Sequence, residues 1–191
     1  MQPKIYLTLE EIENAKQYFI RNNYKQDCLK IAVIPGAYYP SQRWPIERFG
    51  ELIKKICEKS QARILIFTTK KEDNLDRISA FLDPARVAVL SGLDLRQFMA
   101  YLSQCHMLIC NNTGPLHIAS GLGIPTVSTM GPTVPQLWWP LGKNHIVIRK
   151  GLACSPCSRG VCRSHECLES ISVAEMEKAL DSLLERLRVR Q

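Results

Sequence analysis

The sequence predicts an α/β fold in which helices cover both faces of a parallel sheet. Short apolar runs without polar interruptions, such as 30–35 (KIAVIP) and 107–110 (MLIC), are typical of strands that are buried on both faces. Amphipathic helical segments stand between these runs along the chain. Because parallel strands must be joined by crossovers, this alternation of strand and helix indicates a parallel, doubly wound sheet.

The elements follow one another in a regular order. Thr8 and Glu11 form the pattern of a capping box, and apolar residues recur behind them at helical spacing as far as Asn22. After the strand at 30–35, Pro45 begins a second helix with an apolar face. The remaining expected elements are strand 63–67, helix 71–82, strand 87–90, helix 95–104, strand 107–110, helix 115–121, strand 126–129, strand 146–148 and a last helix from 173 to about 187.

The stretch 110–133 has the pattern of a binding site. An apolar run stops at two asparagines, Thr113 and Gly114, and another resumes at Leu116, which predicts a strand, a tight turn and a helix start. Thr113 or Asn112 can cap this helix through a side-chain oxygen, and Gly114 lets a ligand approach the backbone closely. Converging N–H dipoles at such a helix start favour anions, phosphates above all.

His117 lies within the first turn of this expected helix. A lone histidine is more often structural than catalytic, but its position beside an anion-binding turn favours a functional role. As a hydrogen-bond donor it could stabilise the negative charge of a leaving phosphate. Neither a Ser/His/Asp arrangement nor a pair of carboxylates of the glycosidase type is evident.

In open parallel sheets ligands bind beyond the carboxyl ends of the strands, so the other loops at that edge are candidates as well. Ser41, Gln42 and Arg43 lie between the first strand and the helix that follows it. Arg43 could hold a phosphate through two N–H groups, although it could equally be an exposed loop residue. Thr69 follows the second strand, where its hydroxyl could meet a polar ligand. No GxGxxG or GxxxxGK[ST] motif occurs.

Length and composition bound the organisation of the chain. With 191 residues, 46% of them hydrophobic and 23% charged, we expect a single domain over 1–191 with one well-formed core. No stretch approaches the roughly 20 apolar residues of a membrane span, and no signal peptide is recognisable, so we expect a soluble, cytoplasmic protein. The net charge of +7 comes from scattered basic residues, a distribution that argues against nucleic acid as a partner.

Half of the eight cysteines lie in one expected loop, 151–170. These are Cys154, Cys157, Cys162 and Cys167, with the spacing C-x2-C-x4-C-x4-C. The ligand type and spacing could hold a structural Zn²⁺ tetrahedrally. A disulfide and free thiols are the alternatives, and a cytoplasmic setting disfavours the disulfide.

Several motifs, taken in order, resemble one known family. PGAxxxxQRWPxExF begins at residue 35, NNTGPLHIASGLGIPTVSTMGPT begins at residue 111, and the C-x2-C loop follows. In this order they are similar to the carboxyl-terminal domain of glycosyltransferase family 9, the ADP-heptose:lipopolysaccharide heptosyltransferases. The likeness runs from Lys4 to the last helix, and NTGPLH followed by GPT is its most specific part.

The resemblance implies a Rossmann-like domain that forms the carboxyl-terminal half of a GT-B glycosyltransferase and binds an ADP-sugar. It implies that the diphosphate and sugar contact Asn112, Thr113, Gly114 and His117, and that the loop from Gly36 to Arg43 reaches the phosphates. No cofactor is required. Gln42 stands where the family usually carries Lys, and Asn112 stands where it usually carries Asp, so one positive and one negative charge are missing.

The acceptor implied by the resemblance is the lipopolysaccharide core, bound by an amino-terminal domain that this chain lacks. We therefore expect the isolated chain to bind the donor without catalysing much transfer. Peripheral association with the cytoplasmic face of the inner membrane also follows from the resemblance. The alternative is a non-catalytic module that binds a nucleotide or a nucleotide sugar.

Overall fold

A computed structural model describes residues 3–22, 24, 28–69 and 75–188, with the side chain of residue 188 excepted. Its centre is a six-stranded sheet in the order β3-β2-β1-β4-β5-β6, and every neighbouring pair is parallel. The strands are β1 (Lys30–Ile34), β2 (Arg63–Thr68), β3 (Val87–Ser91), β4 (Met107–Asn111), β5 (Thr126–Met130) and β6 (His145–Arg149). The predicted fold class is confirmed.

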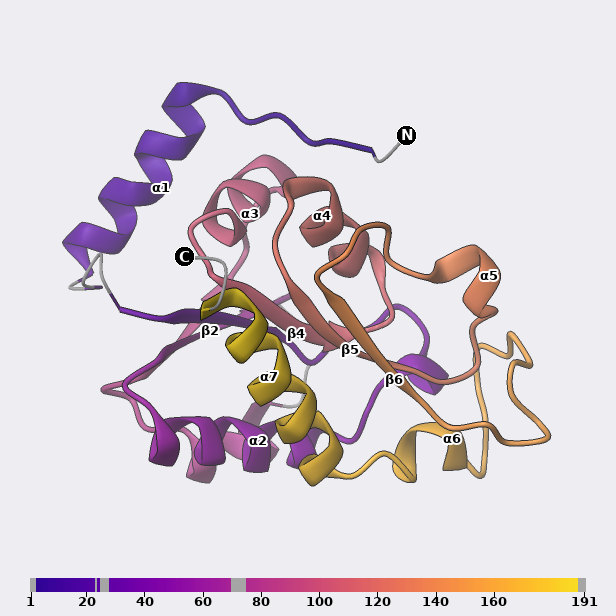
Figure 1. The fold of residues 1–191 in the computed structure, drawn as a ribbon. Coiled ribbons are helices and arrows are strands. Elements are labelled where there is room, and N and C mark those ends of the chain that lie inside the picture. The colour runs from indigo at the N-terminus through magenta and orange to yellow at the C-terminus, as the bar shows by residue number, and fades with distance from the viewer. Residues whose placement is uncertain (1–2, 23, 25–27, 70–74, 189–191) are drawn as a thin grey trace.

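Helices enclose the sheet from both sides (Figure 1). The α-helices are α1 (Leu9–Arg21), α2 (Ile46–Lys59), α3 (Leu95–Leu102), α4 (Gly114–Leu122), α5 (Pro135–Trp138), α6 (Glu166–Glu169) and α7 (Val173–Arg188), and the 3₁₀ helices are η1 (Pro40–Gln42) and η2 (Leu75–Phe81). One core cluster lies between the sheet and the layer of α2 and α7, and another lies between the sheet and α1, α3 and α4. The four inner strands are therefore buried on both faces, which explains the apolar runs of β1, β2 and β4, whereas the edge strands β3 and β6 are mostly half-buried or exposed.

The first helix is held by the contacts that its sequence predicts. The Glu11 N–H donates to Thr8 Oγ1 at 3.2 Å, and the Thr8 N–H donates to Glu11 Oε2 at 2.7 Å, which completes the capping box. Hydrogen bonds from Arg96 and from the Thr8 N–H lower the pKa of Glu11 to about 2. The Arg96 Nε to Glu11 Oε1 distance is 2.5 Å, so this ion pair joins α1 to α3.

The segment expected as a helix over 71–82 differs from its prediction. Residues 70–74 lie outside the described part, and Leu75–Phe81 is a 3₁₀ helix. Its hydrogen bonds span three residues, as in that from the Leu82 N–H to the Ser79 carbonyl at 3.1 Å. Ile78 packs against Gly50 of α2 so closely that a Cβ there would meet Ile78 Cγ2 at 2.9 Å.

The order of the strands indicates which part of the sheet can bind a ligand. The chain runs outward from β1 to β3 and then returns to β4 beside β1, so the loops after β1 and β4 leave the sheet in opposite directions. A crevice at such a reversal point is where open parallel sheets bind their ligands. None of the helices in the described ranges is both long and apolar enough to cross a bilayer.

Candidate functional site

The turn between β4 and α4 presents the start of a helix to solvent. Thr113 is the N-cap residue with extended backbone geometry, but its side chain makes no capping hydrogen bond, so the expected cap from Thr113 is wrong. Gly114 is exposed, and a Cβ built on it would meet nothing within 4 Å. Packing therefore does not require glycine here. The result is an open approach to the first-turn N–H groups, which suits an anion.

Asn112 and His117 connect this turn to α5. The Asn112 side chain is buried, and its Nδ2 donates to the Trp138 carbonyl at 2.9 Å. The rings of His117 and Trp138 lie 5.9 Å apart between centroids. The hydrogen bond from residue 112 to the Trp138 carbonyl requires a donor, which the amide of Asn112 supplies and an ionised carboxylate does not. Asn112 thus has a structural use that the Asp usual in the family pattern would not serve.

His117 carries a polar atom that the protein does not satisfy. Its Nε2 is buried and has no hydrogen-bond partner within the described part of the chain. Burial lowers the pKa of His117, so the imidazole is neutral at pH 7. A neutral imidazole still has one N–H to donate. Contact of this ring with a ligand that enters beside α4 stays a prediction.

An apolar hollow of about 470 Å³ opens beside this turn, at the carboxyl ends of β1, β2 and β3. Its lining includes Gly36, Phe67, Thr69, Leu93, Phe98 and Thr113. Three predicted residues, Gly36, Thr69 and Thr113, are thus brought together from separate loops. The apolar residues Phe67, Leu93 and Phe98 were not predicted for the site, because in sequence they belong to ordinary amphipathic or strand patterns.

The predicted residues of the β1 loop have different surroundings. Arg43 Nε donates to the Ala37 carbonyl at 2.9 Å, and Arg43 lines a second hollow of about 300 Å³ together with Gly36 and His165. Gln42 ends the 3₁₀ helix η1 and is half-buried. Contact of Gln42 and Arg43 with a ligand stays a prediction.

Ser41 is only 2% exposed, and its polar groups are engaged by the cysteine-rich loop. Its Oγ donates to the Arg159 carbonyl at 2.5 Å, its N–H donates to the Gly160 carbonyl at 3.2 Å, and His165 Nε2 lies 3.1 Å from its carbonyl oxygen. These bonds make Ser41 an anchor for that loop, and contact of Ser41 with a ligand stays a prediction. Sequence alone could not show this, because the partners are more than a hundred residues away.

The cysteine-rich loop also braces the turn after β5. The N–H groups of Cys157 and Ser158 donate to the Pro132 carbonyl at 3.0 and 2.8 Å. Ser155 Oγ donates to the Gly131 carbonyl at 2.7 Å. The cysteine-rich loop therefore joins the loop after β1 to the turn after β5 through hydrogen bonds, and Leu168 also packs closely against Gly131.

The four cysteines of this loop are free thiols that differ in exposure. Cys154 and Cys157 are exposed, Cys162 is half-buried and Cys167 is buried. Burial and the neighbouring thiols raise the pKa of Cys167. Within the described ranges no group of three or more His, Cys, Asp and Glu side chains is arranged to hold a metal ion. The described positions of these side chains do not form a zinc site, and zinc binding by Cys154, Cys157, Cys162 and Cys167 stays a prediction.

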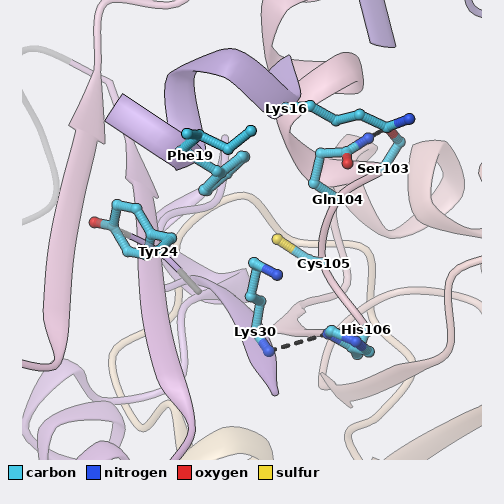
Figure 2. Close-up of a pocket in the computed structure, with 9 residues that line it drawn as sticks. Lys16, Phe19, Tyr24, Lys30, Ser103, Gln104, Cys105 and His106 are labelled. Atoms are coloured by element: carbon cyan, nitrogen blue, oxygen red, sulfur yellow. Dashed lines mark hydrogen bonds between the residues drawn. The ribbon is translucent and has the colours of Figure 1, made fainter. Parts of the chain in front are cut away.

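A third hollow, of about 400 Å³, lies at the opposite edge of the sheet, near the amino ends of β1 and β4 (Figure 2). Its lining includes Lys16, Phe19, Tyr24, Gln104 and His106. The Lys30 N–H donates to His106 Nδ1 at 3.0 Å, and Gln104 Nε2 donates to Ser103 Oγ at 3.1 Å. Among the described elements no helix begins at this hollow, and its lining includes none of the predicted site residues.

Comparison with known proteins identifies the family of the chain. The profile of glycosyltransferase family 9 (heptosyltransferase) matches residues 1–168. The chain belongs to this family. Among its relatives, lipopolysaccharide heptosyltransferase 2 of Escherichia coli K12 is 27% identical over 154 residues, covering 78% of this chain and 44% of the relative. Lipooligosaccharide heptosyltransferase 2 of Haemophilus ducreyi is 30% identical over 156 residues, covering 77% and 44%.

Solved structures of the family share the fold. The E. coli ADP-heptose LPS heptosyltransferase II superposes with a TM-score of 0.80 at 24% identity, covering 98% of this chain and 55% of its own. The family 9 glycosyltransferase of Veillonella parvula gives 0.81 at 22% identity, covering 96% and 54%. The E. coli heptosyltransferase WaaC, solved with ADP, gives 0.68 at 20% identity, covering 87% and 48%. This family 9 chain thus spans about half the length of its relatives.

Proposed function

We propose that this chain is the donor-binding half of a glycosyltransferase that transfers a heptose-type sugar from an ADP-sugar to a lipopolysaccharide core acceptor. The observation that carries the proposal is the open α4 start at Gly114 beside the apolar hollow of about 470 Å³. The helix start suits an anion, and the apolar hollow suits an aromatic base. Together they match the two chemically different ends of a nucleotide diphosphate.

The nucleobase occupies the apolar hollow between the ends of β2 and β3 and the side chain of Phe98. Phe98 packs edge-to-face on Phe67, with the ring centroids 5.3 Å apart, so this wall is rigid. The hollow has the size of a typical small-molecule site, roughly 300–1,000 Å³. Gly36 and Thr113, which also line it, then lie where the base gives way to the phosphates.

The diphosphate lies at the start of α4. An acceptor hydroxyl attacks the anomeric carbon of the donor sugar, the new glycosidic C–O bond forms, and the bond from that carbon to the phosphate oxygen breaks. ADP leaves with the bonding electrons. The first-turn N–H groups and the N–H of neutral His117 stabilise the charge that develops on the phosphate. The proton of the acceptor hydroxyl passes to a base in the acceptor-binding domain.

The relatives support this assignment by their names. The first two are a lipopolysaccharide heptosyltransferase and a lipooligosaccharide heptosyltransferase, one solved relative is an ADP-heptose LPS heptosyltransferase, and WaaC was solved with ADP. Action at the cytoplasmic face of the inner membrane is part of the same proposal.

Calorimetric titration of the chain with ADP, UDP and GDP tests the proposal directly. We expect ADP to bind more tightly than UDP and GDP, because the hollow selects among bases. Equal affinity for the three, or no binding, would contradict it. Mixing the chain with a separately prepared acceptor domain of a two-domain relative should then produce transfer from ADP-heptose.

A second candidate is a nucleotide-binding module without catalysis. The observation that favours it is the pair of departures at Gln42 and Asn112, because each removes a charge that the family pattern carries. The Asn112 side chain also donates a hydrogen bond to the Trp138 carbonyl. This candidate predicts ADP binding with no transfer in the presence of an acceptor domain, whereas the enzyme half predicts both.

A further inference from the structure

Asn111 is the last residue of β4. Its side chain makes more hydrogen bonds to other segments than the side chains of the turn that follows it. It is fully buried. Its Oδ1 accepts from the Trp44 N–H at 2.9 Å and from Thr129 Oγ1 at 3.0 Å. Its Nδ2 donates to the Pro35 carbonyl at 2.7 Å and, in a longer contact of 3.4 Å, to the Gly36 carbonyl. The amide thus uses both of its oxygen lone pairs and both of its N–H groups.

These four partners belong to the segments that carry the candidate site. Pro35 and Gly36 begin the loop after β1, and Trp44 ends it. Thr129 lies in β5 just before the turn at 131–133. Asn111 itself is followed by the turn that leads into α4. One side chain therefore ties the loop after β1 and the end of β5 to the start of α4, at the point where the strand order reverses.

No other side chain of this size can make the same set of bonds. Leucine has no polar atom, and aspartate offers oxygen acceptors to Trp44 and Thr129 but, when ionised, no donor to the carbonyl of Pro35. A buried carbonyl that loses its donor is left without a partner, which favours movement of the loop that carries it.

We propose that Asn111 is a positioning residue. It holds the loop after β1, at Gly36, at such a distance from the start of α4 that one nucleotide diphosphate can contact the loop and the helix start together. The proposal rests on the proposed function of the same edge. It assigns to Asn111 no contact with the ligand. Its effect is transmitted through the backbone of the loop after β1.

The test compares Asn111→Asp with a conservative core change at the far edge, Ile64→Val, in the full 191-residue chain. Ile64 is fully buried near the amino end of β2. Two quantities are measured on each protein: the affinity for ADP, and amide hydrogen exchange over residues 36–44 and 129–134. Thermal unfolding establishes that each variant is folded at the temperature used.

We expect Asn111→Asp to weaken ADP binding about tenfold at pH 8, because the buried Pro35 carbonyl loses its donor and the loop that carries it moves. Exchange in both loops should become faster. The loss relative to the unmodified chain should shrink at lower pH, because a protonated carboxyl can again donate to Pro35. Ile64→Val should lower the unfolding temperature and leave ADP affinity and exchange in both loops unchanged.

Equal effects of the two substitutions on ADP affinity and on loop exchange would overturn the positioning role, since stability alone would then explain them. If the unmodified chain does not bind ADP, the proposed function fails, and hydrogen exchange still decides the role of Asn111. Unchanged exchange over 36–44 and 129–134 in Asn111→Asp would overturn the inference in that case also.

Discussion

The two edges of the sheet carry hollows of similar size but of different chemistry. The hollow at the carboxyl edge, about 470 Å³, is apolar and adjoins the open start of α4. The hollow at the amino edge, about 400 Å³, is lined by several polar and charged side chains, some of which bond to one another, as well as by Phe19 and Ile20. Volume alone does not distinguish them. In the part of the chain that the structure describes, the start of α4 and the unsatisfied Nε2 of His117 lie at the carboxyl edge and distinguish it from the amino edge.

The difference teaches that the direction of the strands determines where a ligand can be bound. In a parallel sheet each crossover helix begins at the carboxyl edge, so positive helix ends gather there. At the amino edge the helices end, and polar groups such as the Lys30 N–H and His106 Nδ1 satisfy one another. Substitutions of the same kind at the two edges should therefore have different effects on nucleotide binding.

The largest contrast should come from introducing leucine at each edge. Gly114→Leu places a side chain in front of α4, at a position where a Cβ meets nothing within 4 Å. We expect it to weaken ADP binding at least about a hundredfold, or ~3 kcal/mol. Gln104→Leu at the amino edge should leave binding unchanged. Calorimetry on both variants makes the comparison, and equal affinities for ADP would refute the placement of the phosphates.

A smaller contrast should follow from shortening an apolar side chain at each edge. Phe98→Ala removes an aromatic wall of the carboxyl hollow and should weaken ADP binding about tenfold. Ile20→Ala shortens an exposed side chain that lines the amino hollow, and it should leave ADP binding unchanged. Inorganic pyrophosphate is the control ligand, because it lacks a base and its binding should be insensitive to Phe98→Ala.

Lowering the pH should destabilise the fold through the histidines at both edges, whereas ADP affinity should not depend on the histidine at the amino edge. Burial lowers the pKa of both His117 and His106, so below about pH 6.5 the unfolded chain takes up protons that the folded chain does not. Stability should therefore be full above that pH and fall as the pH drops towards 5. His106→Asn should reduce this fall in unfolding temperature without changing ADP affinity. A fall that is unaltered by His106→Asn would assign the effect to other groups.

The smallest effect is expected from chelation. The cysteine-rich loop is held by hydrogen bonds from Ser155 and Cys157 to the turn after β5 and from Ser41 to Arg159. Treatment with a chelator should therefore leave both the unfolding temperature and ADP affinity unchanged. Elemental analysis showing about one zinc per chain, together with destabilisation on chelation, would establish the metal site predicted from spacing.

The sequence by itself determined the fold class, most elements and the position of the α4 start. The capping box at Thr8 and Glu11, the unbroken apolar strands and the turn before Gly114 all express local rules, in which a residue and its near neighbours decide the conformation. For the same reason η2 was predicted as an ordinary helix. Its close packing on Gly50 of α2 is not visible in its own sequence.

Only the tertiary structure decided which of the candidate residues come together. It joined Gly36, Thr69 and Thr113 around an apolar hollow, and it turned Ser41 towards Arg159 in a loop far along the chain. It also revealed that Asn111 links the loop after β1 to β5. Such contacts depend on strand order and register, which bring distant residues within hydrogen-bond reach and leave no local pattern in the sequence.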